Sequence, residues 1–155
     1  MAQAMIQSAA TRVGLQAMQA GTPVLTLDGA LPVEFLSLGD RILTRAGARR
    51  LRQIEVTVVQ NARMVRISKH ALGVERPSDD MMVSADQRIF IRDWRAKALY
   101  GAAQVLVPAS RLADGANIRS EIAAEVRLFT LGFDDDAVIY AGGLELACGK
   151  VMVEA

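Results

Sequence analysis

The sequence from Gly21 to Gly47 reads GTPVLTLDGALPVEFLSLGDRILTRAG. Its apolar runs are short, and they end at residues that favour tight turns, such as Asp28-Gly29 and Gly39-Asp40. Glycine and proline recur through the stretch and interrupt any longer element. We therefore predict a series of short strands joined by turns, beginning at Pro23.

The rest of the chain continues this pattern. Residues 64–69 alternate between two sets of side chains, which predicts a strand with one buried and one solvated face. The other predicted strands cover residues 33–36, 41–44, 51–59, 81–91, 104–108, 126–133, 137–141 and 151–153, and one helical turn is predicted at 110–113. Closely spaced short strands, with only 5% aromatic residues, predict an all-β fold with substantial curvature.

The chain is predicted to form a single β domain over residues 17–155, preceded by an N-terminal arm at residues 1–16. The arm is rich in Ala, Met and Gln. Its apolar residues recur at helical spacing, so a short helix is predicted within residues 2–18, although Gly14 weakens it.

Composition narrows the classes of function. The 155 residues include 18 basic and 17 acidic side chains, a net charge of +1 that predicts neither a nucleic-acid nor a membrane partner. The single cysteine, Cys148, excludes an intramolecular disulfide and a cysteine-built zinc site. Because we find no secretory leader and no apolar run of membrane-spanning length, we expect a cytoplasmic location.

Three blocks of sequence then occur in a specific order. The first is the stretch from Gly21 to Gly47. The second comprises ALG at 71–73, Pro77, Asp80 and MVSADQRI at 82–89, and the third comprises ALYG at 98–101, VLVPA at 105–109 and Leu112. With a weaker block at 129–143, they resemble the bacterial Hedgehog/intein (Hint) domain family over about residues 17–146. This resemblance implies a compact, horseshoe-shaped β fold with pseudo-twofold symmetry.

The resemblance also implies a chemistry. Hint domains cut their own chain by an acyl shift that needs a nucleophile and proton-transferring groups. The family's cysteine, four residues before the glycine of the GT pair, corresponds to Ala17. The second block keeps Ser84 at its Ser/Thr position but has Gln87 where the family has histidine, and the two later histidines align near Thr130 and Asp136.

Other residues with chemical potential have a structural interpretation that we favour. Cys148 is interpreted as a buried small hydrophobe and Trp94 as a core residue rather than an exposed anchor for a partner. His70, the only histidine, is interpreted as a surface loop residue. The acidic pair Asp79-Asp80 and the run at 134–136 are predicted to be exposed turns rather than cation sites.

The densest basic cluster lies at a predicted hairpin end. It comprises Arg45, Arg49, Arg50 and Arg52. We interpret it as a solvated hairpin end in preference to an anion or phosphate patch.

The leading hypothesis is a non-catalytic Hint-like domain that binds a protein partner or itself, with no cofactor and no metal. The rival is a residual self-processing enzyme with Ser84 or Thr22 as its nucleophile. A third hypothesis is a structural subunit of a larger, phage-like particle.

Overall fold

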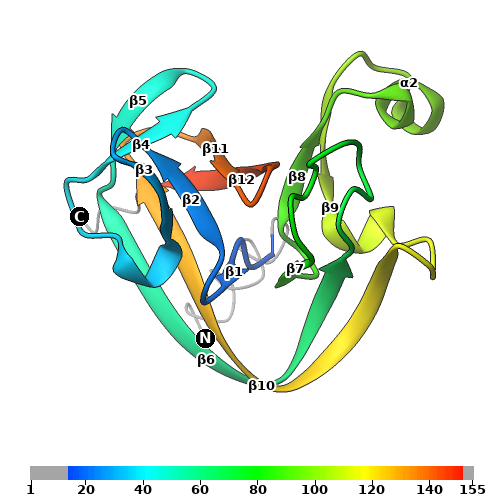
Figure 1. Ribbon diagram of the computed structural model, residues 1–155, viewed down its shortest axis with the longest axis horizontal. Helices are drawn as coiled ribbons and strands as arrows, with labels where there is room; N and C mark the ends of the chain where they lie inside the picture. Colours follow the sequence, from blue (N-terminus) through cyan, green and yellow to red (C-terminus); the bar gives the residue numbers. More distant parts are fainter. Residues whose placement is uncertain (1–13, 152–155) are drawn as a thin grey trace, which may run out of the picture.

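Two long antiparallel strands form the base of the computed structural model, which describes residues 14–151. β6 (Gln53–Ile67) pairs with β10 (Ile118–Phe133) along almost their entire lengths. The pair bends at the bottom of the molecule and rises into two arms, which gives the protein a horseshoe shape (Figure 1). Asn61 lies within the gap in the ladder between Gln60 and Ala62 and takes a φ of 51°, a conformation that asparagine tolerates.

One arm contains the early hairpins. β2 (Pro23–Thr26) pairs with β3 (Gly29–Pro32), and β4 (Arg41–Thr44) pairs with β5 (Gly47–Arg50). The short 3-10 helix η1 (Val33–Phe35) connects the two hairpins. The last hairpin of the described chain, β11 (Ala137–Ala141) and β12 (Leu144–Lys150), pairs with this arm through β2 and β4.

The other arm contains the middle of the chain. β7 (Met81–Ser84) pairs with β6, and β8 (Arg88–Ile91) pairs with β9 (Val105–Pro108) and β12. The helix α2 (Trp94–Tyr100) and the 3-10 helix η2 (Ala109–Leu112) flank β9 in sequence. β1 (Met18–Gln19) lies between the arms, where it pairs with both β7 and β10 (Figure 1).

Two apolar clusters stabilise this arrangement. The larger one includes fully buried side chains from both arms, such as Val24, Ile42, Ile89 and Leu146. The smaller one lies over the β6–β10 ladder and comprises Ala17, Ala62, Met64, Met82, Val126 and Leu128. Burial of such aliphatic side chains stabilises the fold by roughly 1.5–3 kcal/mol each. The mainly β architecture confirms the predicted fold class.

Several local predictions change in the structure. The segment Trp94–Tyr100, for which no helix was predicted, is a helix capped by Asp93 and ended by Gly101 with φ 67°. The predicted core position of Trp94 is wrong, because its side chain is 67% exposed. The predicted strand at 126–133 is the second half of the longer β10.

The predictions for the two chain ends fall largely on residues outside 14–151. The predicted helix at 2–18 lies mostly outside the described residues, and its described end is not helical, because residues 14–17 carry no regular structure and Met18 belongs to β1. The predicted strand at 151–153 also lies largely outside them, and β12 ends at Lys150. The helical turn predicted at 110–113 is confirmed one residue earlier as η2.

Candidate functional site

The site is built around Ala17, directly before β1. Ala17 is fully buried, and its carbonyl oxygen accepts a hydrogen bond of 3.0 Å from the backbone N–H of Ser84 at the end of β7. β1 also pairs with β10, with Met18 opposite Phe129. Ala17 is therefore held from both sides by neighbouring strands, and its methyl group lies in the smaller apolar cluster.

The side chain of Gln87 contacts Gln16, the residue directly before Ala17. Its side chain is buried, and its Nε2 lies 3.3 Å from Gln16 Oε1 and 2.9 Å from the carbonyl oxygens of Ala147 and Arg88. These contacts join the start of the domain to β8 and β12. An amide can donate such hydrogen bonds, but it cannot exchange a proton near neutral pH.

Two further hydrogen bonds hold the side chain of Gln16. Its Oε1 accepts the backbone N–H of Arg88 at 2.8 Å, and its Nε2 donates to the carbonyl oxygen of Asp86 at 2.7 Å. The turn after β7 therefore holds the Gln16–Ala17 peptide bond in one position.

Ser84 completes this group. Its side chain is buried, and its hydroxyl donates a hydrogen bond of 2.5 Å to the carbonyl oxygen of Leu15. The structure thus brings together Ala17, Ser84 and Gln87, although 70 residues of chain separate the first from the last.

Of the other two residues aligned with family histidines, Thr130 lies near this group and Asp136 does not hydrogen-bond to it. Thr130 lies on β10 one residue beyond Phe129, and the β1–β10 register, extended by one pair, places Ala17 opposite it. Asp136 lies in the exposed turn before β11, where its carboxylate accepts the backbone N–H of Lys150 at 3.1 Å. Among residues 14–151, no hydrogen bond joins Asp136 to Ala17, Ser84 or Gln87.

Comparisons with known proteins agree with this geometry. The sequence profile described as a Hint domain matches residues 16–147. The chain belongs to the Hint-domain family. Its match begins at Gln16, next to the converged group, and ends at Ala147, whose carbonyl oxygen Gln87 contacts.

Solved structures show the same fold at low sequence identity. A bacterial intein-like domain from Clostridium thermocellum is 17% identical, with a TM-score of 0.61 over 88% of this chain and 99% of that chain. The TvoVMA intein is 14% identical, with a TM-score of 0.59 over 84% and 96% of the two chains. The gp41-1 intein is 13% identical, with a TM-score of 0.57 over 84% and 96%. A search of curated proteins finds no match.

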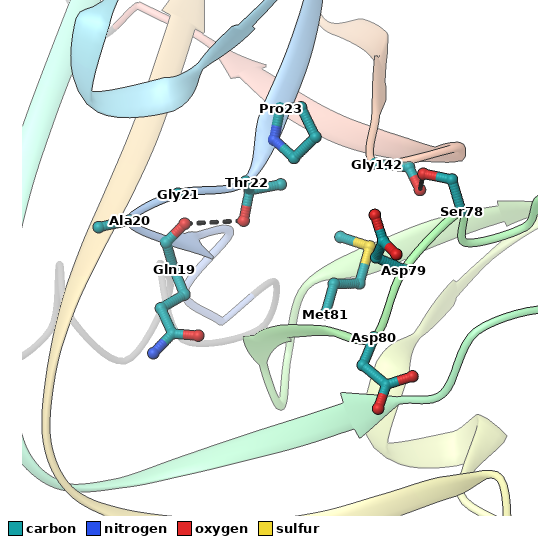
Figure 2. A pocket seen from close by; sticks show the side chains of 10 residues that line it. All are labelled: Gln19, Ala20, Gly21, Thr22, Pro23, Ser78, Asp79, Asp80, Met81 and Gly142. Atoms are coloured by element: carbon teal, nitrogen blue, oxygen red, sulfur yellow. Dashed lines mark hydrogen bonds between the residues drawn. The ribbon is translucent and has the colours of Figure 1, made fainter.

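A polar cavity of about 340 Å3 lies where the chain leaves β1 in this Hint domain, and Ala17, Ser84 and Gln87 are not among the residues that line it. Figure 2 shows residues 19–23 on one side of it and residues 78–81 on the other, with Gly142 at its edge. The hydroxyl of Thr22 donates to the carbonyl oxygen of Gln19 at 2.7 Å, and the carboxylate of Asp80 accepts the backbone N–H of Lys69 at 2.7 Å. Both groups therefore serve local backbone contacts.

The sequence pattern did not single out Glu145, the buried acidic residue on β12. Its side chain forms ion pairs with Arg45 at 2.5 Å, Arg92 at 3.1 Å and Arg76 at 3.4 Å. Burial raises the pKa of the Glu145 carboxyl, but hydrogen bonds from Arg45 and Arg92 outweigh burial, so its pKa lies below the ordinary value. A glutamate amid apolar residues of a strand gives no signal in sequence unless its partners are known.

The remaining candidate residues lie where their structural interpretation placed them, with Cys148 buried and with His70 and residues 134–136 exposed. Cys148 is buried, and burial raises the pKa of its thiol to about 12. His70 is exposed in the loop after β6, and its Nδ1 accepts the backbone N–H of Glu75 at 2.9 Å. The acidic residues at 134–136 form an exposed turn, as predicted.

The predicted hairpin-end cluster divides in two. Arg49 and Arg50 are exposed, and Arg52 pairs with Asp134, whereas Arg45 is also exposed but forms an ion pair with the buried Glu145. Among residues 14–151, no group of three or more His, Cys, Asp or Glu side chains is arranged to hold a metal ion. In the same range, no helix is both long and apolar enough to cross a bilayer.

Proposed function

We propose that this Hint domain no longer cuts its own chain and serves as a module for binding a protein partner or a second copy of itself. One observation supports the proposal most. The three residues at the family's processing positions converge on the Gln16–Ala17 bond, yet Ala17 has no nucleophilic atom and Gln87 cannot move a proton.

The contacts of Gln87 support the same interpretation. Its amide joins the Gln16 side chain to the backbone of β8 and β12, a bridge between the chain start and the arms. A residue retained for stability, rather than for chemistry, is expected to form such contacts. General acid or base groups contribute about 10²–10⁴-fold each to rate, and loss of the nucleophile removes the covalent route entirely.

The direct test uses intact mass. Purified protein is incubated for hours with and without a thiol or hydroxylamine, and no shorter product is expected. A product with a junction at Gln16–Ala17 would contradict the proposal.

Restoring the chemistry gives a positive control for this test. The double variant Ala17→Cys with Gln87→His supplies a nucleophile and an imidazole at positions that already converge. We expect thiol-dependent cleavage in this variant and much less in Ala17→Cys alone. Circular dichroism checks that both variants fold correctly, because Ala17 and Gln87 are both buried in the wild-type protein.

Residual self-processing is the second candidate, and the contact of Ser84 with Leu15 favours it. The serine hydroxyl donates to a backbone carbonyl two residues before Ala17, so a hydroxyl already lies at a peptide bond. Any wild-type cleavage that disappears in Ser84→Ala but persists in Thr22→Ala would establish this candidate.

The binding partner, its assembly and its location are also proposals. Light scattering of the purified protein and a pull-down from the native host test self-association, a protein partner or a place in a larger, phage-like particle. A strictly monomeric protein without a retained partner would contradict the module hypothesis. Fractionation of the host tests the proposed cytoplasmic location.

A further inference from the structure

Three arginines gather around the buried carboxylate of Glu145, and a fourth, Arg88, lies on the same face of the sheet. Arg88, Phe90 and Arg92 alternate with the buried Ile89 and Ile91 along β8 and its end, so they share the opposite face. We call Arg45, Arg76, Arg88 and Arg92 the arginine groove. Three of them form ion pairs with Glu145, and Arg88 shares the face of Phe90.

The groove carries more positive charge than its acidic residues neutralise. Three of its guanidinium groups pair with Glu145, and Asp136 lines the adjoining cavity with Arg45 and Arg88, so four positive and two negative charges leave an excess of two. The whole chain has a net charge of only +1, so this excess is concentrated on one face. Such an excess raises the local concentration of anions.

Two donors in the groove have no acceptor. Among the described residues, the buried side-chain nitrogen or oxygen atoms without a hydrogen-bond partner are Arg76 Nε and Arg88 Nε. Both belong to the groove. A buried donor that lacks an acceptor costs roughly 1–3 kcal/mol, and such a group in a folded protein points to an additional acceptor.

The groove opens beside a cavity of about 280 Å3. Arg45 and Arg88 line it together with Phe90, Leu106 and Val138. The guanidinium of Arg45 lies 4.2 Å from the centre of the Phe90 ring, which holds it in place. The lining is therefore mainly apolar, and two of its three charged side chains are cationic, with Asp136 as the third, a combination that suits an anionic group on an apolar body.

We infer that the arginine groove binds a phosphate monoester whose apolar part contacts Phe90, Leu106 and Val138. Guanidinium groups match phosphate oxygens through paired hydrogen bonds. A phosphate monoester carries a charge of about −1.5 to −2 at pH 7, which matches the excess of two positive charges better than a carboxylate does. The inference is independent of whether the domain cleaves its own chain.

The test compares small anions at constant chloride concentration, with amide chemical shifts or calorimetry as the readout. The probes are phenyl phosphate, inorganic phosphate and benzoate. We expect phenyl phosphate to bind most tightly, inorganic phosphate more weakly because it lacks an apolar part, and benzoate most weakly because it carries a single charge. Equal affinity for phenyl phosphate and benzoate, or no binding of either above the chloride background, overturns the inference.

Single substitutions test whether phenyl phosphate binds at the arginine groove. Arg92→Gln and Arg88→Gln are each expected to weaken phenyl phosphate binding by about tenfold, because each removes a charged hydrogen-bond donor. Arg119→Gln makes the same charge change on β10, outside the groove, and is expected to leave binding unchanged. Equal weakening by all three variants would show a nonspecific charge effect and overturn the site.

Glu145→Gln separates binding from stability. The variant loses a negative charge from the groove, so phenyl phosphate binding is expected to tighten even if the fold is less stable. The side chain of Arg92 is 51% exposed, so Arg92→Gln retains the fold most safely among the groove variants. Weaker binding by a folded Glu145→Gln variant would contradict the proposed charge balance.

Discussion

Cys148 illustrates how much the surroundings of one residue change its chemistry. Its thiol is buried on β12, opposite Ala137 of β11, and burial raises its pKa to about 12. Because the thiolate is the reactive form, we expect iodoacetamide to leave the native protein unmodified at pH 8 over hours. The same thiol is expected to react completely in denaturant, as measured by intact mass. Rapid modification of the native protein would mean that the β11–β12 hairpin opens in solution.

At the scale of an element, the β11–β12 turn depends on two consecutive glycines. Gly143 has a φ of 91°, and a Cβ atom there would lie 2.2 Å from the carbonyl oxygen of Glu75 in the loop after β6. Gly143→Ala therefore adds a backbone clash to an unfavourable dihedral angle, and we expect a loss of about 2–4 kcal/mol in unfolding free energy. Denaturant unfolding measures this loss.

A matched control is available in the β2–β3 hairpin. Gly29 has a comparable φ of 101°, but a Cβ atom there meets nothing within 4 Å. Gly29→Ala is expected to cost only about 1–2 kcal/mol, from the dihedral angle alone. Equal losses in the two variants would show that the contact between the β11–β12 turn and Glu75 adds nothing to stability.

At the scale of the whole molecule, Glu145 connects segments that are far apart in the chain. Its partners lie in the β4–β5 turn, the loop after β6 and the end of β8, so its charge contributes to joining the two arms. The folded-state pKa lies below the ordinary value of 4.5, so the ionised form stabilises the fold above about pH 4.5. This stabilisation is lost as the pH falls through the folded-state pKa.

The matching experiment compares wild type with Glu145→Gln across pH. At pH 7 the variant is expected to be less stable by about 1–2 kcal/mol, because the ion pairs are partly exposed to solvent. The difference in unfolding free energy should narrow as the pH falls below 4.5, as measured by urea unfolding. A constant difference from about pH 7 to about pH 3 would mean that the carboxylate charge makes no contribution.

The sequence alone determined the class of fold and most of the turns. Short apolar runs that end at residue pairs containing glycine, such as Asp28-Gly29, specify hairpins locally. A turn forms when its own few residues adopt the required dihedral angles. The same local reasoning missed α2, although Asp93 and Gly101 are ordinary helix-end signals, because a helix of 7 residues is too short to show a clear helical period. The block order then placed Ala17, Ser84 and Gln87 at corresponding family positions, and the structure brings them together.

Only the tertiary structure decided which distant charges share a surface. The sequence grouped Arg45 with Arg49 and Arg50 because they are close along the chain. The fold instead gathers Arg45, Arg76 and Arg92 around Glu145, because the curved sheet brings a turn, a loop and a strand end to one face. Electrostatic energy depends on distance in space, and chain order gives no measure of that distance for residues a hundred positions apart.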